Sequence, residues 1–389
     1  MEYLPHWIWA ILAAEFFITL ALTHMLYELR PLKSYGLFYP YTALGGVIGG
    51  ILCAVVFPLI FSTEIEIHLI TIILIGLFAH YLFKSFAYPI TILFLVISVL
   101  IFGIPITKNI LPKERELNLR SIYGALTVLA GEQQLHLLHG PIQHGSQFTS
   151  PEKSLTPTTY YTESGSVGML IRRLQKQRES IHIGVVGLGT GTLAAYLRPQ
   201  DTITFWEIDP LSEKVATEVF SFLDETLGTV EIIIQDGRLG VSNFTEELDL
   251  LVVDAFSGDG VPMHLLTKEA LEAYAAKTKD GLVALHVTNQ HLRIGRVAQS
   301  TVEALGYDSL AVISAPTQET MKAVNATGSI YMFYMEASDG SLFAALKTQL
   351  TNDKRQDEFF FDQAPDPTLF WTDDHHAVWP IIKWSDLLK

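Results

Sequence analysis

Charged side chains are scarce in the first quarter of the chain, and this unevenness constrains the possible folds more than any other feature. Residues 1–106 hold three basic and five acidic side chains, whereas 23 basic and 36 acidic side chains follow. A helix that crosses a bilayer needs about 20 consecutive, mainly apolar residues. Four runs approach that length: Trp7–Leu29, Leu37–Phe61, Ile65–Phe83 and Tyr88–Ile106. We therefore predict a transmembrane region of about four helices in residues 1–106, with the lipid bilayer as a partner.

Composition excludes several other classes of protein. Apolar residues make up 49% of the chain, which argues against intrinsic disorder. The single cysteine, Cys53, excludes a disulfide scaffold and a cysteine-based zinc site within one chain. The formal net charge of −15 argues against a nucleic-acid partner, which would need a basic face for the phosphates. A small cationic substrate fits this charge better.

From about Ser180 onward, short β-rich runs alternate with helical patterns such as Pro210–Phe222 and Thr267–Thr278. The β-rich runs are Ile181–Leu188, Thr202–Ile208, Val230–Gln235, Leu248–Val253 and Leu282–Val287. This alternation predicts βαβ units and a doubly wound, parallel sheet. Ligands bind such folds beyond the carboxyl ends of the strands, where the strand order reverses.

A glycine-rich turn follows the first of these strands. Gly187, Gly189 and Gly191 allow a tight turn and a close approach of the backbone to a ligand. The next strand ends at Glu207 and Asp209, where an acid can hold ribose hydroxyls. This pattern suits a dinucleotide and an S-adenosylmethionine-type nucleoside equally well. No Gly-Lys-Ser/Thr sequence follows, which excludes a phosphate loop.

The third and fourth strands also end in acids. Asp236 precedes Gly237, and Asp254 begins the sequence Asp-Ala-Phe-Ser-Gly-Asp. One acid at such a place is more often a helix cap than a ligand-binding group. Acids after three successive strands favour a binding site.

Eight segments together carry the pattern of a known family. They are Leu44–Phe61, Leu138–Gly145, Pro157–Tyr161, Gly187–Thr192, Phe205–Pro210, Asp236–Leu239, Asp254–Thr267 and Trp371–Asp374. The chain resembles the spermidine synthase family of aminopropyltransferases, in the branch with N-terminal transmembrane helices. The resemblance implies an α/β fold with a small β-domain in residues 107–165. A Rossmann-like domain, similar to class I methyltransferases, would occupy residues 166–389.

The resemblance also implies an activity and its partners. The family transfers an aminopropyl group from decarboxylated S-adenosylmethionine to an amine and releases methylthioadenosine. The sulfonium is already an activated leaving group, so neither a metal nor a tightly bound cofactor is expected. Relatives commonly form dimers, so a homodimer is a further expectation. The protein is expected to be a multi-pass protein of the cell membrane. A cytosolic donor favours a cytoplasmic catalytic domain, although the basic residues of the loops balance between the two orientations.

Roles for single residues follow from the same resemblance. On the nucleoside side stand Gly187, Gly189, Gly191, Glu207, Asp236 and Gly237. On the amine side stand Gln143, Tyr161 and Glu163, with Asp254, Asp259 and Tyr161 as the catalytic candidates. The attacking amine is protonated in water, with a pKa near 10 if it resembles lysine. A carboxylate must therefore position it and accept a proton.

Two positions depart from the family pattern. Thr190 stands where soluble spermidine synthases carry an aspartate, and Ser257 stands where they carry the proton-accepting aspartate. Asp259, two residues later, is the candidate replacement. These departures keep two alternatives open: a methyltransferase that uses S-adenosylmethionine, and a non-catalytic sensor of a nucleoside or polyamine. His264 and His286 are interpreted as structural histidines.

Overall fold

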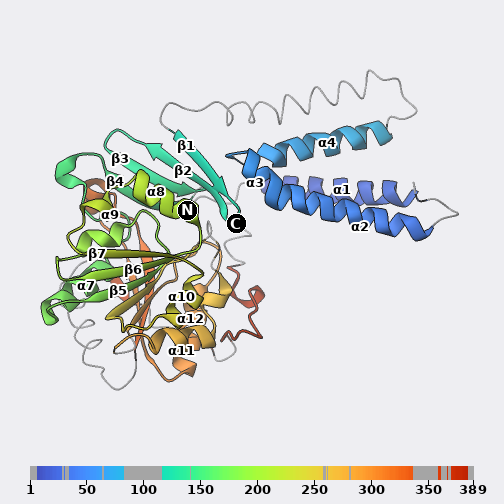
Figure 1. Ribbon diagram of the computed structural model, residues 1–389. Coiled ribbons are helices and arrows are strands. Elements are labelled where there is room, and N and C mark those ends of the chain that lie inside the picture. The colour runs from blue at the N-terminus through green and yellow to red at the C-terminus, as the bar shows by residue number, and fades with distance from the viewer. Residues whose placement is uncertain are drawn as a thin grey trace. The chain divides into compact units, whose positions relative to one another are not determined.

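The structure is a computed structural model (Figure 1). It describes residues 7–28, 30, 35–63, 65–82, 116–140, 142–256, 260, 262–279, 282–335, 358–360, 366 and 369–383. Contacts divide the chain into two compact units, Met1–Ala125 with Lys389, and Leu126–Leu388. Each unit is described by itself. The domain boundaries expected at residues 106 and 165 stay predictions.

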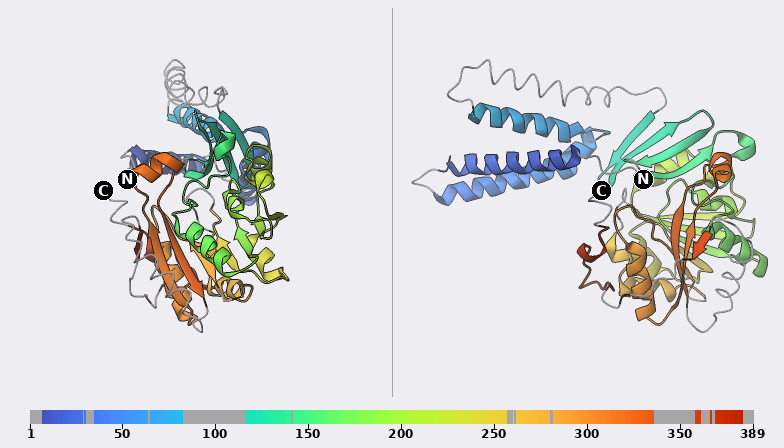
Figure 2. Two further views of the ribbon diagram at one scale, coloured as in Figure 1. Left: turned by 90° about the vertical axis from the view of Figure 1, so that its left-hand side faces the viewer. Right: turned by 180° about the vertical axis from the view of Figure 1, so that it is seen from behind.

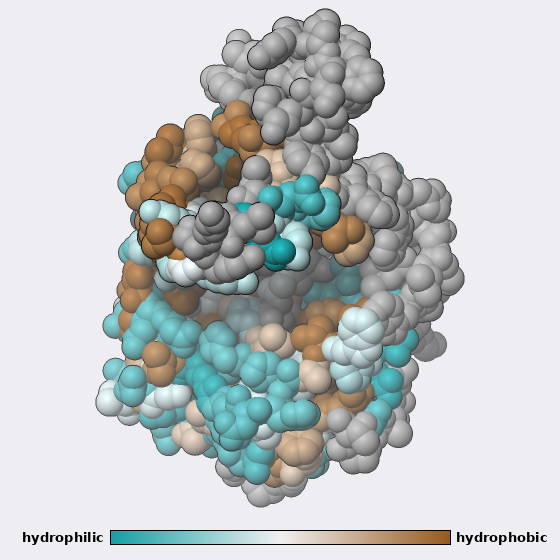
Figure 3. Space-filling model, turned by 90° about the vertical axis from the view of Figure 1, so that its right-hand side faces the viewer, coloured by the Kyte–Doolittle hydropathy of each residue, from teal (hydrophilic) through white to brown (hydrophobic). Residues whose placement is uncertain are grey.

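Apolar helices make up most of the N-terminal unit. They are α1 (Trp7–Glu28), α2 (Tyr35–Ile51), a π-helical turn (Leu52–Val56), α3 (Phe57–Ile60) and α4 (Ile65–Leu82). The continuous helix Gly36–Ile60 is long and apolar enough to cross a membrane, and its apolar window has no buried residues. At 1.5 Å per residue its 25 residues span about 37 Å, more than the roughly 30 Å of a hydrocarbon core. Apolar side chains such as Val47 and Leu59 are exposed, and Figure 3 shows brown, apolar groups at the surface.

The prediction of about four spans is met only in a coarser form. Among the described residues, one helix satisfies the length and composition of a membrane span. Helices α1 and α4 cover the first and third predicted runs. The fourth predicted run, Tyr88–Ile106, lies outside the described residues.

A small four-stranded sheet follows in the order β1-β2-β3-β4. Its strands are β1 (Glu116–Ser121), β2 (Gly124–Ala130), β3 (Gln134–His139) and β4 (Ile142–Phe148). Strands β2, β3 and β4 pair antiparallel, and a register shift at Leu137/Leu138 interrupts the β3–β4 ladder. Such a bulge re-aims the side chains that follow it.

An eight-stranded mixed sheet forms the centre of the C-terminal unit, in the order β12-β10-β11-β9-β8-β5-β6-β7. The strands are β5 (His182–Val186), β6 (Thr202–Glu207), β7 (Thr229–Ile234), β8 (Leu250–Val253), β9 (Val283–His286), β10 (Asp308–Ser314), β11 (Ser329–Met335) and β12 (Glu358–Phe360). Strands β5 to β9 pair parallel, and β9 pairs antiparallel with β11. The predicted α/β, Rossmann-like fold is confirmed, with antiparallel strands added at one edge.

Helices cover both faces of this sheet. Successive residues of a strand point to opposite faces, so each central strand contributes to two separate cores. Ile183 and Val185 of β5 join one core with α7 (Ser166–Gln177). Val186, on the other face, joins a second core, which also includes residues of three helices. These helices are α10 (Gly237–Asn243), α11 (Lys268–Ala275) and α12 (Ile294–Ala304). Figures 1 and 2 show the helices around the sheet.

The strand order reverses between β5 and β8. From β5 the chain builds outward through β6 and β7, then returns to the other side of β5 with β8 and β9. Open α/β sheets bind their ligands at such a reversal, beyond the carboxyl ends of the strands. The residues that follow β5, β6, β7 and β8 therefore meet at the expected place.

Candidate active site

The glycine turn after β5 lies directly against the end of β8. Gly187 has a φ of +98°, and a Cβ on this residue would overlap the backbone oxygen of Asp254. The Asp254 N–H donates to the carbonyl of Val186 (2.9 Å), which continues the parallel pairing of the two strands. The missing side chain at Gly187 thus lets Asp254 approach the glycine turn.

Glu207 fixes the turn from its other side. Its carboxylate accepts hydrogen bonds from the N–H groups of Leu188 (3.0 Å) and Asp209 (2.9 Å). Burial raises the pKa of Glu207, and the two N–H donors act in the opposite direction. A carboxylate offers about four acceptor positions, so these two bonds leave capacity for a ligand's hydroxyl donors. Asp209 itself caps α8 (Pro210–Glu218) through the N–H of Leu211 (2.9 Å).

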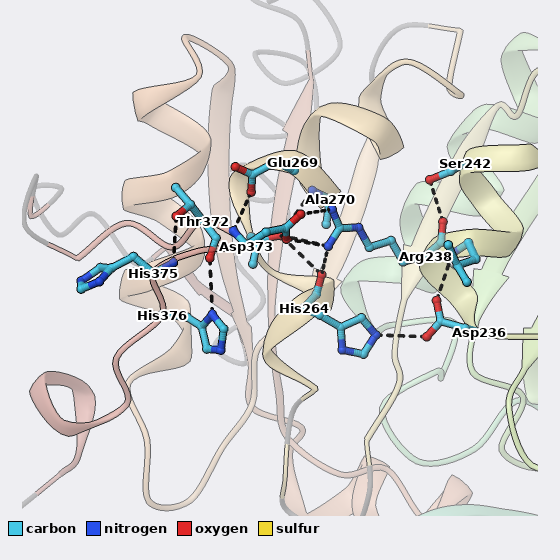
Figure 4. Close-up of polar contacts among 12 residues, drawn as sticks. Asp236, Arg238, Ser242, His264, Glu269, Ala270, Thr372, Asp373, His375 and His376 are labelled. Carbon is cyan, nitrogen blue, oxygen red and sulfur yellow. Dashed lines mark hydrogen bonds and ion pairs between the residues drawn. The ribbon is translucent and has the colours of Figure 1, made fainter.

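Asp236 is the residue that precedes α10. Its Oδ1 accepts from the N–H of Leu239 (3.0 Å), and its Oδ2 lies 3.1 Å from Nε2 of His264 (Figure 4). The next residue, Gly237, packs so closely against Val186 that a Cβ would overlap the valine side chain. The acid therefore has a capping role in addition to the nucleoside role that the sequence predicts.

The side chain of Asp254 is enclosed by two hydrogen-bond partners. Its Oδ2 accepts a hydrogen bond from the Tyr161 hydroxyl, and its Oδ1 lies 2.6 Å from Nδ1 of His286. The side chains of Asp254 and His286 are only 6% and 7% exposed. Burial alone would raise the pKa of Asp254, but His286 and Tyr161 outweigh it and hold that pKa below its ordinary value. The carboxylate is therefore ionised at neutral pH.

Aromatic rings surround this pair. The ring of Tyr331 stacks on His286, with 4.6 Å between the ring centroids. The rings of Tyr160 and Phe256 lie beside the same imidazole, with centroid distances of 4.6 and 5.0 Å. Burial and the nearby carboxylate raise the pKa of Tyr160 and Tyr331 well above the ordinary value. These phenols stay protonated, so the negative charge in this part of the site belongs to Asp254.

Strand β4 also borders the candidate site. A Cβ on Gly145 would come within 2.5 Å of Oγ1 of Thr190, so β4 lies against the glycine turn. Among the described residues, no hydrogen-bond acceptor reaches the buried Nε2 of Gln143. Burial also lowers the pKa of His144 to about 4. Gln143 thus brings an unsatisfied donor to the strand that borders the site, and such a donor is suited to a ligand acceptor.

The remaining residues singled out in the sequence bond to partners other than Asp254 or lie outside the described part of the chain. Glu163 is 64% exposed and pairs with Arg172 (2.7 Å) instead of joining the Asp254 cluster. Asp259 and Ser257 lie outside the described residues, so the role of Asp259 stays a prediction. Thr190, at the place of the family aspartate, is buried and shares a hydrogen bond with the Thr192 hydroxyl (2.8 Å).

Sequence reasoning missed the contact between His286 and Asp254. His286 was interpreted as a structural histidine, and it is indeed buried at the end of β9. Because β9 pairs parallel with β8, its last residue lies at the same edge of the sheet as Asp254. The strand-end argument that selected the acids could have selected this histidine too.

The C-terminal segment reaches the same region through an ion pair. Arg238 donates to both carboxylate oxygens of Asp373 (2.7 and 2.7 Å; Figure 4). The Thr267 hydroxyl donates to the same carboxylate (2.8 Å). The Arg238 contact lowers the pKa of Asp373 to about 2. Nearby, the N–H of Lys268 donates a hydrogen bond to the carbonyl oxygen of Trp371 (2.8 Å).

This pair predicts a pH-dependent contribution to stability. Because the folded pKa of Asp373 lies below the ordinary value of about 3.9, its contribution is present at higher pH and is lost as the pH falls toward 2. Asp373→Asn should lower the melting temperature at pH 7 by about 1–4 °C. The difference from the wild type should shrink below about pH 4. Asp374→Asn, a change of the exposed neighbouring acid, is the control; an unchanged gap at low pH contradicts the assignment.

Comparisons with known proteins give partial similarities. No family model matches the chain. A polyamine aminopropyltransferase of Vibrio vulnificus (strain CMCP6) is 30% identical over 93 residues. The match covers 22% of this chain and 30% of that protein, so the chain spans less than a third of this relative.

Solved structures with similar chains include two described as spermidine synthases. A probable spermidine synthase from Corynebacterium glutamicum ATCC 13032 has 16% sequence identity and a TM-score of 0.47, over 65% of this chain and 91% of that one. A spermidine synthase from Thermotoga maritima has 18% identity and a TM-score of 0.43, over 58% and 75% of the two chains.

Proposed function

We propose that this protein is a membrane-anchored polyamine synthase of the spermidine synthase type. It would transfer an aminopropyl group from decarboxylated S-adenosylmethionine to a small amine and release methylthioadenosine. The observation that carries the proposal is the ionised, buried Asp254, held by Tyr161 and His286 beside the glycine turn. The partial identity to a polyamine aminopropyltransferase supports it.

The nucleoside would bind along the ends of β5, β6 and β7. Gly187, Gly189 and Gly191 all have a positive φ and form the turn beside which the nucleoside would lie, and Glu207 has acceptor capacity for ribose hydroxyls. Asp236 and Gly237 would border the adenine. The sulfonium carbon would then lie toward Asp254, because the turn and Asp254 are in contact.

The reaction would proceed by in-line displacement. The amine nitrogen attacks the carbon beside the sulfonium, the new C–N bond forms, and the electron pair of the C–S bond passes to sulfur. Before or during the attack, the protonated nitrogen gives one proton to Asp254, which frees the electron pair that forms the C–N bond, while Gln143 and Tyr161 orient the amine. Asp259 is the second acid of the proposal.

The membrane part extends this proposal. The apolar helices of residues 1–106 would anchor the enzyme in the cell membrane by several spans, and the helix Gly36–Ile60 is the part best supported. A donor made in the cytosol would place the catalytic unit on the cytoplasmic face. We also propose homodimer formation, as in the family that the sequence resembles.

Product analysis of the purified full chain in detergent tests the activity. The chain is incubated with a mixture of amines and with either form of the cofactor, and the products are read by mass spectrometry. We expect methylthioadenosine together with an amine that is heavier by one aminopropyl group. S-adenosylhomocysteine with a methylated product would show a methyltransferase instead. Nucleoside binding without any product would show a sensor.

A further inference from the structure

Both ring nitrogens of His286 have partners. Nδ1 lies 2.6 Å from Oδ1 of Asp254, and Nε2 lies 2.7 Å from Oγ1 of Thr288. Thr288 Oγ1 also accepts a hydrogen bond from the N–H of Ile330 on β11 (2.7 Å). The backbone of one strand is thus linked through a hydroxyl and an imidazole to the acid at the end of another.

These partners select one form of the neutral imidazole. An ionised carboxylate only accepts hydrogen bonds, so Nδ1 of His286 must carry the proton that faces Asp254. In the neutral imidazole Nε2 is then an acceptor, to which the Thr288 hydroxyl can donate while it accepts from Ile330. Each donor in this chain meets one acceptor. The orientation of a histidine is commonly set in this way, by the partner of its second nitrogen.

The surroundings hold the ring in place. His286 is buried, and its ring stacks on Tyr331 and contacts the rings of Tyr160 and Phe256. Among the described residues, the titratable groups that interact with Asp254 besides His286 are the phenols of Tyr160, Tyr161 and Tyr331 and the imidazole of His144. Burial keeps these groups neutral near pH 7, because it raises the pKa of the phenols and lowers that of His144. The carboxylate therefore meets no other ionised side chain in this set.

We propose that His286, oriented by Thr288, is the positioning residue that prepares Asp254 to receive the proton of the attacking amine. This inference rests on the proposed function. The Nδ1–H of His286 holds Oδ1, the Tyr161 hydroxyl holds Oδ2, and the remaining acceptor positions of the carboxylate stay available to the amine. The histidine also keeps the carboxylate charged in a buried place, where burial alone would favour its neutral form.

The test uses His286→Phe and His286→Asn in the full chain. Phenylalanine keeps an aromatic ring but removes both hydrogen bonds, whereas the asparagine amide can still donate toward Asp254. We expect His286→Phe to lower kcat for aminopropyl transfer by about 10²-fold, the lower end of what a proton-accepting group contributes. The acid limb of its pH profile should move to higher pH, because burial of Asp254 is then opposed less. His286→Asn should recover part of kcat, and Thr288→Val should give an intermediate loss.

His182 supplies a matched control. It lies on β5 of the same sheet, with Nε2 2.8 Å from the Thr204 hydroxyl and Nδ1 3.4 Å from the Glu246 carboxylate. It therefore has the same kinds of partner as His286 at the opposite, amino-terminal end of a strand. We expect His182→Phe to leave kcat and the pH profile unchanged. Affinity for methylthioadenosine, measured by calorimetry, should stay near the wild-type value in the His286 variants.

The outcomes separate the two proposals. A wild-type protein that forms no aminopropyl product overturns the proposed function and this inference with it. A wild type that forms product, while His286→Phe matches its kcat and its pH profile, overturns the inference alone. The same holds if His182→Phe loses as much kcat as His286→Phe, because the effect is then one of general stability.

Discussion

Replacing Asp254 with asparagine is expected to lower kcat/KM for aminopropyl transfer by about 10²- to 10⁴-fold, the range of a general base. The fold should tolerate the change. The asparagine oxygen can accept from Nδ1 of His286, and the Tyr161 hydroxyl can turn to accept from the amide nitrogen. Transfer rates by mass spectrometry and methylthioadenosine binding by calorimetry are the two measurements.

The control for this variant is Asp308→Asn, which changes an exposed acid at the start of β10. Both variants should bind methylthioadenosine and melt near the wild-type temperature. Only the Asp254 variant should lose turnover. If Asp254→Asn turns over at the wild-type rate, Asp254 is not the proton acceptor. If it loses nucleoside binding as well, its role is structural.

Gly187→Ala should have the largest effect on stability, about 2–5 kcal/mol. The positive φ of +98° costs an alanine about 1–2 kcal/mol, and overlap of its Cβ with the Asp254 backbone adds the cost of overpacking. Relief of the overlap would push the end of β8 away from the turn. The variant should therefore lose nucleoside binding and transfer together, and melt several degrees below the wild type.

A substitution at Gly306 separates the cost of the positive φ from the cost of the overlap. Its φ is +78°, and among the described residues no atom beyond its two chain neighbours lies within 4 Å of a Cβ built there. Gly306→Ala should therefore cost only the backbone strain, about 1–2 kcal/mol, and should leave activity intact. Equal destabilisation of the two variants, measured by chemical denaturation, would show that the contact between Gly187 and Asp254 carries no energetic weight.

The strand ends of the site could be predicted from the sequence. Gly187, Glu207, Asp236 and Asp254 each follow an apolar run, and parallel pairing brings the ends of such runs to one edge. The alternation of runs and helices was sufficient for this step. It did not predict the antiparallel strands β10, β11 and β12, because their pairing depends on long-range contacts.

The amine side of the site was harder to predict because its residues come from separate parts of the fold. Tyr161 precedes α7, and Gln143 belongs to the small sheet. Their positions near the glycine turn depend on tertiary packing, such as the contact between Gly145 and Thr190. The family resemblance supplied these two residues. It did not supply His286, because His286 lies in none of the segments that carry the resemblance.

The order of the site residues along the chain has a consequence for synthesis on the ribosome. Asp254 is followed by its histidine at 286, by the stacking ring at 331 and by Asp373, which holds Arg238. Chains emerge from the N-terminus, and domains fold as units. The apolar helices are therefore translated, and available to a bilayer, long before the residues of the candidate active site can come together. A nascent chain that stalls before residue 373 would carry its helices and an unfinished active site.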